Sequence, residues 1–185
     1  DLGADVIKVE SPGGGDEARD LGITQDAKPK LGVSPSFLAL NRNKRSIVLD
    51  LQSEAGREVA DRLIGSADVI IHNFRPGTMD RWGLGFEAVH QAHPRLIYGE
   101  FFAYGREGPM SDFGANDLAL QAHSGLMSLT GEPGRPPVRV GTAAIDLHGA
   151  MALVGAILAA LYNREKTGLG RRVETSLLLS SAHLL

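Results

Sequence analysis

The stretch Asp68-Val69-Ile70-Ile71-His72 decides the fold class of this sequence. Its three consecutive β-branched residues favour a strand, and the lack of polar alternation is typical of a strand covered on both faces of a parallel sheet. Upstream, Val59, Leu63 and Ile64 recur at helical spacing after another predicted strand at residues 45–50. Since parallel strands need a crossover, usually a helix, this region predicts an α/β fold.

The alternation of strands and helices continues outward in both directions. Further strands are predicted at residues 5–10, 95–104 and 172–175, and helices at residues 53–66, 86–93, 116–127 and 147–165. A short helix or turn is expected at residues 37–40 and another helix from Ser176, while Gly168 stands where a helix-ending glycine is usual. The order predicts a mainly parallel sheet flanked by helices.

The composition excludes several classes of function. The 185 residues include 19 Lys and Arg and 22 Asp and Glu, and this net charge of −3 disfavours broad binding to nucleic acid or an anionic membrane. The absence of cysteine excludes disulfides, Cys-ligated metal and thiol nucleophiles, and fits a cytoplasmic location. The longest apolar run, residues 149–162, is shorter than the roughly 20 residues of a membrane span, so a core helix of a soluble protein is expected.

The ends of the sequence indicate a piece of a longer chain. The first residue is Asp1 rather than methionine, a strand follows almost at once, and residues 176–185 are apolar. Domains usually begin and end in polar, poorly ordered residues. We therefore expect residues 1–185 to be part of a larger protein.

Simple binding motifs are weak or absent. Gly13-Gly14-Gly15 follows a strand but fits neither the dinucleotide fingerprint nor the P-loop, so a plain turn is predicted. None of the six histidines forms an HxH or HExxH pair, so no metal site is predicted. The cluster of Arg42, Lys44 and Arg45 is either a solvated surface turn or an anchor for phosphate groups.

Asp146 has two interpretations. It follows Gly141-Thr142-Ala143-Ala144-Ile145, just before the long apolar helix, where an aspartate is most often an N-cap. The helix dipole also favours a charged carboxylate at this end, and a carboxylate in an apolar neighbourhood can attack an activated acyl group. The residues alone leave both interpretations open.

Two motifs and several shorter blocks occur in a fixed order along the chain. The motifs are Asn73-Phe74-Arg75-Pro76-Gly77 and the stretch from Gly141 to Met151. The other blocks are residues 3–10, 41–51, 67–72, 155–161 and 166–171, with a looser one at 93–98. Together they extend over essentially the whole chain and resemble the family III CoA-transferases, the CaiB/BaiF family.

The resemblance implies a fold, a reaction and a nucleophile. Family members have a Rossmann-like large domain and a small domain, and pair as interlocked homodimers. Residues 1–185 would then be a partial large, CoA-binding domain, without its N-terminal strand and helix and without the small domain. Members transfer CoA from an acyl-CoA to a free carboxylate, and the matching aspartate, Asp146, would carry the covalent intermediates.

The resemblance also implies a site for coenzyme A. Its matching positions are Leu49, Asn73, Phe74, Arg81 and Trp82. Arg81 suits a phosphate, and Phe74 could lie against the adenine or pantetheine. From the residues alone, Phe74 and Trp82 are equally well explained as core aromatics.

Two positions depart from the family pattern. Ser11 and Gln52 stand where relatives can carry a basic contact to CoA. Arg19, Arg42 or Lys44 would have to supply that charge.

Two alternatives to CoA transfer remain. Racemases of the same family have a histidine before the acidic residue that matches Asp117, and here that position is Asn116, whose amide cannot take up a proton. Racemisation is therefore disfavoured. The other alternative is a non-catalytic fragment that binds CoA or forms a dimer.

Overall fold

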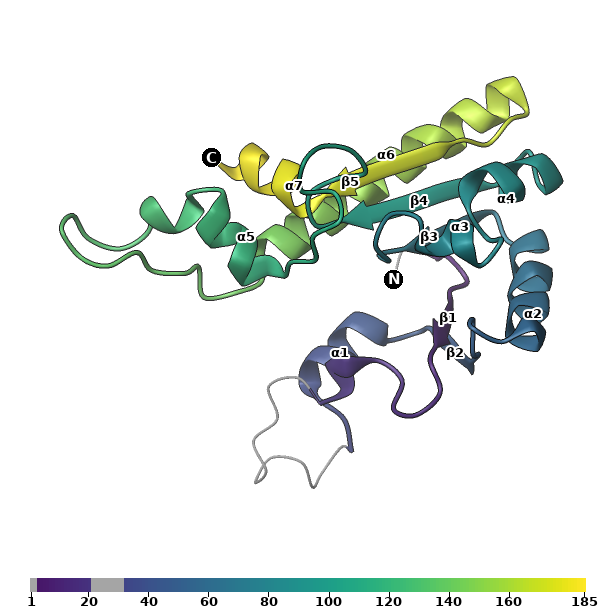
Figure 1. Cartoon of the computed structure of the whole chain (residues 1–185), viewed down its shortest axis with the longest axis horizontal. Coiled ribbons are helices and arrows are strands. Elements are labelled where there is room, and N and C mark those ends of the chain that lie inside the picture. Colours follow the sequence, from purple (N-terminus) through teal and green to yellow (C-terminus); the bar gives the residue numbers. More distant parts are fainter. Residues whose placement is uncertain (1–2, 21–31) are drawn as a thin grey trace. The chain divides into compact units, whose positions relative to one another are not determined.

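The computed structural model describes residues 3–20 and 32–185, and the chain divides into two compact units, Asp1–Arg62 and Leu63–Leu185. The first unit contains β1 (Ile7–Glu10), η1 (Glu17–Arg19), α1 (Pro35–Asn41), β2 (Arg45–Val48) and most of α2 (Glu54–Gly65). The second contains β3 (Val69–His72), α3 (Thr78–Arg81), α4 (Phe86–Ala92), β4 (Ile97–Phe102), α5 (Asp117–His123), η2 (Leu126–Ser128), α6 (Ala144–Thr167), β5 (Arg172–Ser176) and α7 (Leu177–Leu184) (Figure 1).

A parallel pair of strands, β1 and β2, forms the sheet of the first unit. The buried carboxylate of Glu10 in β1 accepts two hydrogen bonds from the Arg19 guanidinium, at 3.0 and 2.8 Å, and one from Ser46 Oγ at 2.7 Å. The bonds from Arg19 and Ser46 hold the pKa of Glu10 at about 2, below its ordinary value of 4.5. Through these hydrogen bonds the Glu10 carboxylate links β1 to β2 and to η1.

The glycine turn after β1 closes on the same carboxylate. A Cβ at Gly15 would collide with Glu10 Oε2, and the N–H of Asp16 donates to that oxygen at 3.0 Å. Gly15 also has a φ of +72°, which residues with a side chain rarely adopt. The turn is therefore built around an internal carboxylate, which favours the plain turn over a phosphate loop.

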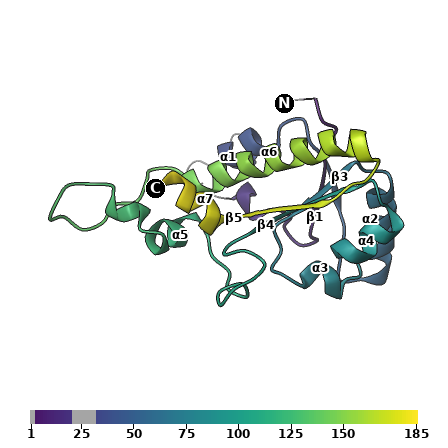
Figure 2. The ribbon, with the colours of Figure 1, turned by 90° about the horizontal axis from the view of Figure 1, so that it is seen from above.

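A parallel sheet in the order β3-β4-β5 forms the centre of the second unit. Ile97 and Tyr98 in the middle strand are fully buried. Side chains alternate along β4, so that Ile97 and Phe101 pack with α6, whereas Tyr98 points the other way and donates from its hydroxyl to the Leu84 carbonyl at 2.8 Å. Figure 2 shows α6 on one side of this sheet and α3 and α4 on the other.

The packing of α6 on the sheet depends on a glycine. A Cβ at Gly149 would lie 2.7 Å from the ring atoms Cε2 and Cζ of Phe101 in β4. Further along α6, Leu153 and Ile157 are buried against Ile97. The missing side chain thus lets the first half of the helix approach β4 closely.

The other side of α6 is apolar and exposed. Leu147, Met151, Leu158 and Tyr162 are each 50 to 66% exposed. By length and composition alone the helix could cross a membrane, but its inner side packs on the sheet as that of a core helix does. The predicted core helix is therefore buried on one side only.

The α/β class and the parallel pairing agree with the prediction. Gly168 ends α6 in the left-handed conformation, as expected. The described strands form two separate sheets rather than one. Apolar runs predict that strands exist, but they carry no information about which strands are hydrogen-bonded neighbours.

Several elements differ from the prediction in their bounds, and some were not predicted at all. α6 begins at Ala144 rather than Leu147, and the helix predicted at residues 116–127 divides into α5 and η2 at Ser124 and Gly125. α3 was not predicted, because a four-residue helix is too short to show a 3.6-residue repeat.

Candidate active site

Asp146 lies in the first turn of α6, as its third residue. The N-cap of this helix is Ala143, which makes no side-chain hydrogen bond to it. The interpretation of Asp146 as an N-cap is therefore wrong. The apolar pattern misplaced the start of α6, because Ala144 and Ile145 precede the first full repeat of the apolar stripe.

A carboxylate from another helix holds the backbone at Asp146. Asp117, the first residue of α5, is buried, and its Oδ2 accepts hydrogen bonds from the N–H groups of Ile145 at 2.8 Å and Asp146 at 3.1 Å. One turn later, Gln121 Oε1 accepts a hydrogen bond from the N–H of Val140 at 2.8 Å. The sequence singled out neither residue for this role, because a helical pattern does not show which distant backbone a buried polar side chain reaches.

Asp146 lines a cavity of about 210 Å³. The other lining residues come from the start of α5 and from the segment before α6, and they are Asn116, Asp117, Leu118, Gln121, Arg139, Thr142 and Ala143. Burial, together with the neighbouring Asp117 carboxylate, raises the pKa of Asp146 above its ordinary value of 3.8. The helix dipole alone would lower this pKa, so burial and charge repulsion outweigh it. A carboxyl group with a perturbed pKa at a cavity is a candidate for catalysis.

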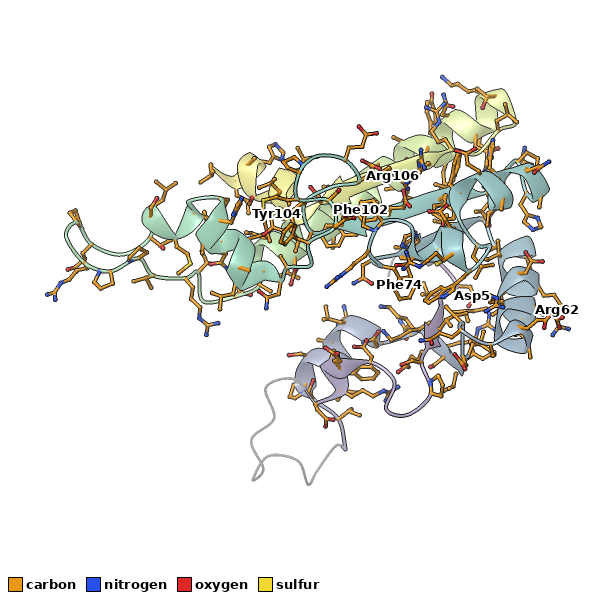
Figure 3. The ribbon with its side chains drawn as sticks, viewed as in Figure 1. Asp5, Arg62, Phe74, Phe102, Tyr104 and Arg106 are labelled. Carbon is orange, nitrogen blue, oxygen red and sulfur yellow. The ribbon has the colours of Figure 1, made fainter. Side chains whose placement is uncertain are left out.

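The turn after β3 brings together four of the five predicted CoA-binding residues. Asn73 is exposed, and the Phe74 ring is 38% exposed (Figure 3). The centre of the Phe74 ring lies 5.8 Å from that of His72 and 5.2 Å from that of Trp82. Arg81, at the end of α3, is exposed as well. Phe74 and Trp82 thus pack together, while Phe74 keeps surface for a ligand.

The same turn lies against the segment that leads into α5. The guanidinium of Arg75 is so close to Gly114 that a Cβ there would lie 2.9 Å from Nη2. Gly114 precedes Asp117 by three residues. The candidate CoA-binding turn therefore contacts the segment that supports Asp146, and Arg75 is a cation that the predicted site omitted.

The fifth predicted residue, Leu49, belongs to the first unit. It directly follows β2 and is half-buried. Ser11 and Gln52, where the family pattern is broken, belong to the same unit.

Two of the three cations expected to replace a basic residue at those positions, Arg19 and Lys44, are engaged in local structure. Arg19 is ion-paired with Glu10, as described above. Lys44 Nζ donates to Asn41 Oδ1 at 3.2 Å, and burial lowers the pKa of this amino group. In the same positive cluster, Arg45 donates to Asp5 at 3.1 Å.

A buried ionic group that the sequence did not predict lies on the side of β4 that faces away from α6. Glu100 is 4% exposed, Arg106 donates to its Oε1 at 2.6 Å, and His72 Nε2 lies 3.4 Å from the same oxygen. Burial raises the pKa of Glu100, but the contacts with His72 and Arg106 outweigh it and lower the pKa below 4.5. The Arg106 guanidinium also lies 5.7 Å from the centre of the Phe102 ring (Figure 3). A glutamate inside an apolar strand gives no local signal of these partners.

The position at which racemases have a histidine has a structural role here. Asn116 is the N-cap of α5, and its Oδ1 accepts a hydrogen bond from the N–H of Ala119 at 3.0 Å. Within the described residues, no three His, Cys, Asp or Glu side chains come close enough together to hold a metal ion.

Comparison with known proteins gives a consistent result. Residues 1–185 match the model of CoA-transferase family III. The chain is 43% identical over 179 residues to an acetyl-CoA:oxalate CoA-transferase of Acetobacter aceti, covering 96% of this chain and 44% of that protein. It is 39% identical over 186 residues to the succinyl-CoA:glutarate CoA-transferase of Homo sapiens, covering 100% of this chain and 41% of that protein.

A solved structure agrees with these matches. A CaiB/BaiF family protein from Brucella suis superposes with a TM-score of 0.92 at 40% identity, covering 100% of this chain and 49% of that one. The chain thus spans less than half the length of each of these relatives.

Proposed function

Because the chain belongs to CoA-transferase family III, we propose that it supplies the nucleophile and part of the CoA site of an acyl-CoA:carboxylate CoA-transferase. The observation that carries the proposal is the position of Asp146, which lines a cavity of about 210 Å³ together with Arg139. The cavity gives a substrate access to the carboxylate, and the arginine offers a cation to an acceptor carboxylate.

The first half of the proposed reaction unloads the donor. An oxygen of Asp146 attacks the thioester carbonyl of the acyl-CoA, the carbon–sulfur bond breaks, and CoA leaves as a thiolate. The product is a mixed anhydride between the acyl group and Asp146. The thiolate then attacks the aspartyl carbonyl, which releases the donor acid and leaves an aspartyl-CoA thioester.

The second half loads the acceptor by the same steps in reverse. The acceptor carboxylate attacks the aspartyl thioester, so that CoA leaves again and a new mixed anhydride forms. The thiolate attacks the acceptor's carbonyl in this anhydride. The new acyl-CoA departs, and Asp146 returns to its free carboxylate without any net change in protons or electrons.

Within the second unit, the CoA part of the proposed site is the turn after β3 together with α3. Phe74 offers an exposed ring to the adenine or pantetheine, and Trp82 packs nearly perpendicular to that ring with the centres 5.2 Å apart. Arg81 and Asn73 supply a charge and an amide for the phosphates. In this proposal the protein acts as a cytoplasmic homodimer.

The relatives suggest which substrates to test first. Their names combine acetyl-CoA with oxalate and succinyl-CoA with glutarate. We therefore propose a short-chain acyl-CoA as donor and a small dicarboxylate as acceptor. Racemisation is not supported, because Asn116 caps α5 where a base would be needed.

The test uses the full-length protein and Asp146→Asn. The amide is nearly isosteric but cannot form an anhydride, so CoA exchange should fall by at least about 1,000-fold while the protein still melts cooperatively. Hydroxylamine should trap an acyl group on the wild-type protein and none on the variant.

The outcomes separate the alternatives. Wild-type turnover in Asp146→Asn would remove Asp146 from the mechanism. CoA binding without any exchange, over a panel of short acyl-CoA and dicarboxylate pairs, would favour the non-catalytic alternative.

A further inference from the structure

The first backbone N–H groups of α6 bond to a side chain of another helix rather than to a side chain at the N-cap. The first N–H groups of a helix have no partner within it, and a side chain at the N-cap usually accepts one of them. Ala143 has no side-chain oxygen to do so. The N–H of Ala144 bonds to the Thr142 carbonyl at 2.9 Å, but those of Ile145 and Asp146 depend on α5.

Two residues one turn apart on α5 take over this task. Asp117 Oδ2 accepts both N–H groups, while its Oδ1 accepts a hydrogen bond from the Gln121 side chain. Gln121, 1% exposed, also donates to the Thr142 carbonyl at 3.3 Å and accepts from the N–H of Val140 at 2.8 Å. Asp117 and Gln121 thus form a clamp on the segment that ends in Asp146.

We propose that Asp117 is the positioning residue for Asp146: with Gln121 it replaces the missing cap of α6 and so fixes the direction in which the nucleophile leaves the helix. This inference rests on the proposed function, in which Asp146 is the nucleophile. Asp117 acts through backbone N–H groups and does not itself react. A small displacement of a reacting atom can cost roughly 100-fold in rate, so a fixed first turn matters for catalysis.

The charge of Asp117 adds a second effect. The Asp117 carboxylate helps to raise the pKa of Asp146, and Arg139 is the other charged group that lines the cavity. Asp117→Asn keeps an oxygen that can accept the two N–H groups but removes the charge. Asp117→Ala removes both. The two variants therefore separate the geometric effect from the electrostatic one.

The experiment compares these variants with Ser34→Ala in the full-length protein. Ser34 is the fully buried N-cap of α1 in the first unit, and its Oγ accepts a hydrogen bond from the N–H of Phe37 at 2.9 Å. Ser34→Ala therefore removes a helix cap, as Asp117→Ala does, but at a different helix. Amide hydrogen exchange at residues 145 and 146 measures how strongly the two hydrogen bonds to Asp117 protect these N–H groups. The kinetic readouts are kcat and KM separately, and the pH profile of kcat/KM.

For Asp117→Ala we expect at least about tenfold faster exchange at residues 145 and 146, because two hydrogen bonds are lost. We also expect a fall in kcat of about 100-fold, with little change in the KM for acyl-CoA. Asp117→Asn should retain most of the protection and shift the acidic limb of the pH profile to lower pH. Ser34→Ala should change none of these.

Unchanged exchange at residues 145 and 146 in Asp117→Ala would overturn the proposal, and so would an equal loss of kcat in Ser34→Ala. If Asp117→Ala does not fold, Gln121→Ala and the pH profile of Asp117→Asn take its place. Gln121→Ala should speed exchange at residue 140, and an unshifted profile in Asp117→Asn counts against the proposal. If Asp146 proves not to be the nucleophile, the exchange data still decide whether the clamp exists.

Discussion

The carboxyl group of Asp146 costs the folded protein stability at neutral pH. Its pKa is raised in the folded state, so the folded protein binds this proton more tightly than the unfolded chain does. The resulting stabilisation is complete below pH 3.8 and is lost as the pH rises through the folded pKa. Such a cost is common at sites where chemistry, rather than packing, decides the residue.

Asp146→Asn should therefore melt at a higher temperature than the wild type at pH 7.5, and the difference should shrink at pH 4. Asparagine is nearly isosteric and carries no charge to desolvate. Thermal melting at the two pH values measures the effect. Asp61→Asn, at an exposed position on α2, is the control and should leave the melting temperature almost unchanged. A pH-independent difference would contradict the assignment.

Arg81 allows a direct test of the CoA site. Arg81→Ala in the full-length protein should weaken CoA binding by about 1.5 to 3 kcal/mol, or roughly 10- to 150-fold, if the guanidinium bonds to a phosphate. Isothermal titration with CoA gives the Kd. Arg62→Ala, an exposed arginine on α2, serves as control (Figure 3). An unchanged Kd for Arg81→Ala would remove Arg81 from the site.

At the scale of the element, α6 carries two glycines with opposite roles. Gly149 lies against Phe101, whereas a Cβ at Gly155 would meet nothing within 4 Å. Gly155→Ala should stabilise the protein by up to about 1 kcal/mol, because alanine favours the helix. Gly149→Ala should destabilise it by about 1 kcal/mol or more, because the Phe101 ring must move. Urea unfolding of both variants measures this, and an equal gain at both positions would show that α6 does not lie this close to β4.

The same helix shows what the sequence can and cannot predict. Its existence, its length to within a few residues and its end at Gly168 follow from the apolar run and the glycine. Its start does not, because the N–H groups of Ile145 and Asp146 bond to the side chain of Asp117, 28 and 29 residues earlier in the chain. Capping rules consider only the residues next to a helix, and they therefore predicted Asp146 as the N-cap. In the structure, Asp117 accepts the N–H groups that an N-cap would have accepted.

At the scale of the whole molecule, the class of fold was predictable and the assembly of the site was only partly so. Phe74 and Trp82 are close in the sequence, and the short turn and α3 between them bring the two rings into contact. The contact of Arg75 with Gly114 and that of His72 in β3 with Glu100 in β4 join segments far apart in the sequence, and no local pattern encodes them. Two sheets formed where the alternation of elements indicated one, because pairing is decided by tertiary contacts.

Each unit holds one buried glutamate whose lowered pKa makes stability depend on acid. Glu10 and Glu100 both release their protons more readily in the folded protein than in the unfolded chain. Their stabilisation is therefore present above pH 4.5 and is lost as the pH falls; for Glu10 the loss runs from about pH 4.5 to about 2.

Melting temperatures between pH 7 and pH 3 should accordingly fall more steeply in the wild type than in Glu10→Gln or Glu100→Gln, both of which should already be less stable at pH 7. Glu132→Gln, in an exposed loop, should melt with the wild-type pH dependence. If the melting temperature fell equally steeply with pH in all the variants, groups other than Glu10 and Glu100 would be responsible for the acid sensitivity.

The clamp between α5 and α6 also has a use in protein engineering. Thr130 Oγ1 donates to the Val138 carbonyl, and the residues between them are exposed, so the loop is closed before the clamped segment begins at Val140. Doubling the length of a flexible loop costs only about 0.6 kcal/mol in closure entropy. An epitope or a fluorophore-binding peptide inserted after Gly134 should therefore leave the clamped segment in place, and the exposed loop could carry it as a label.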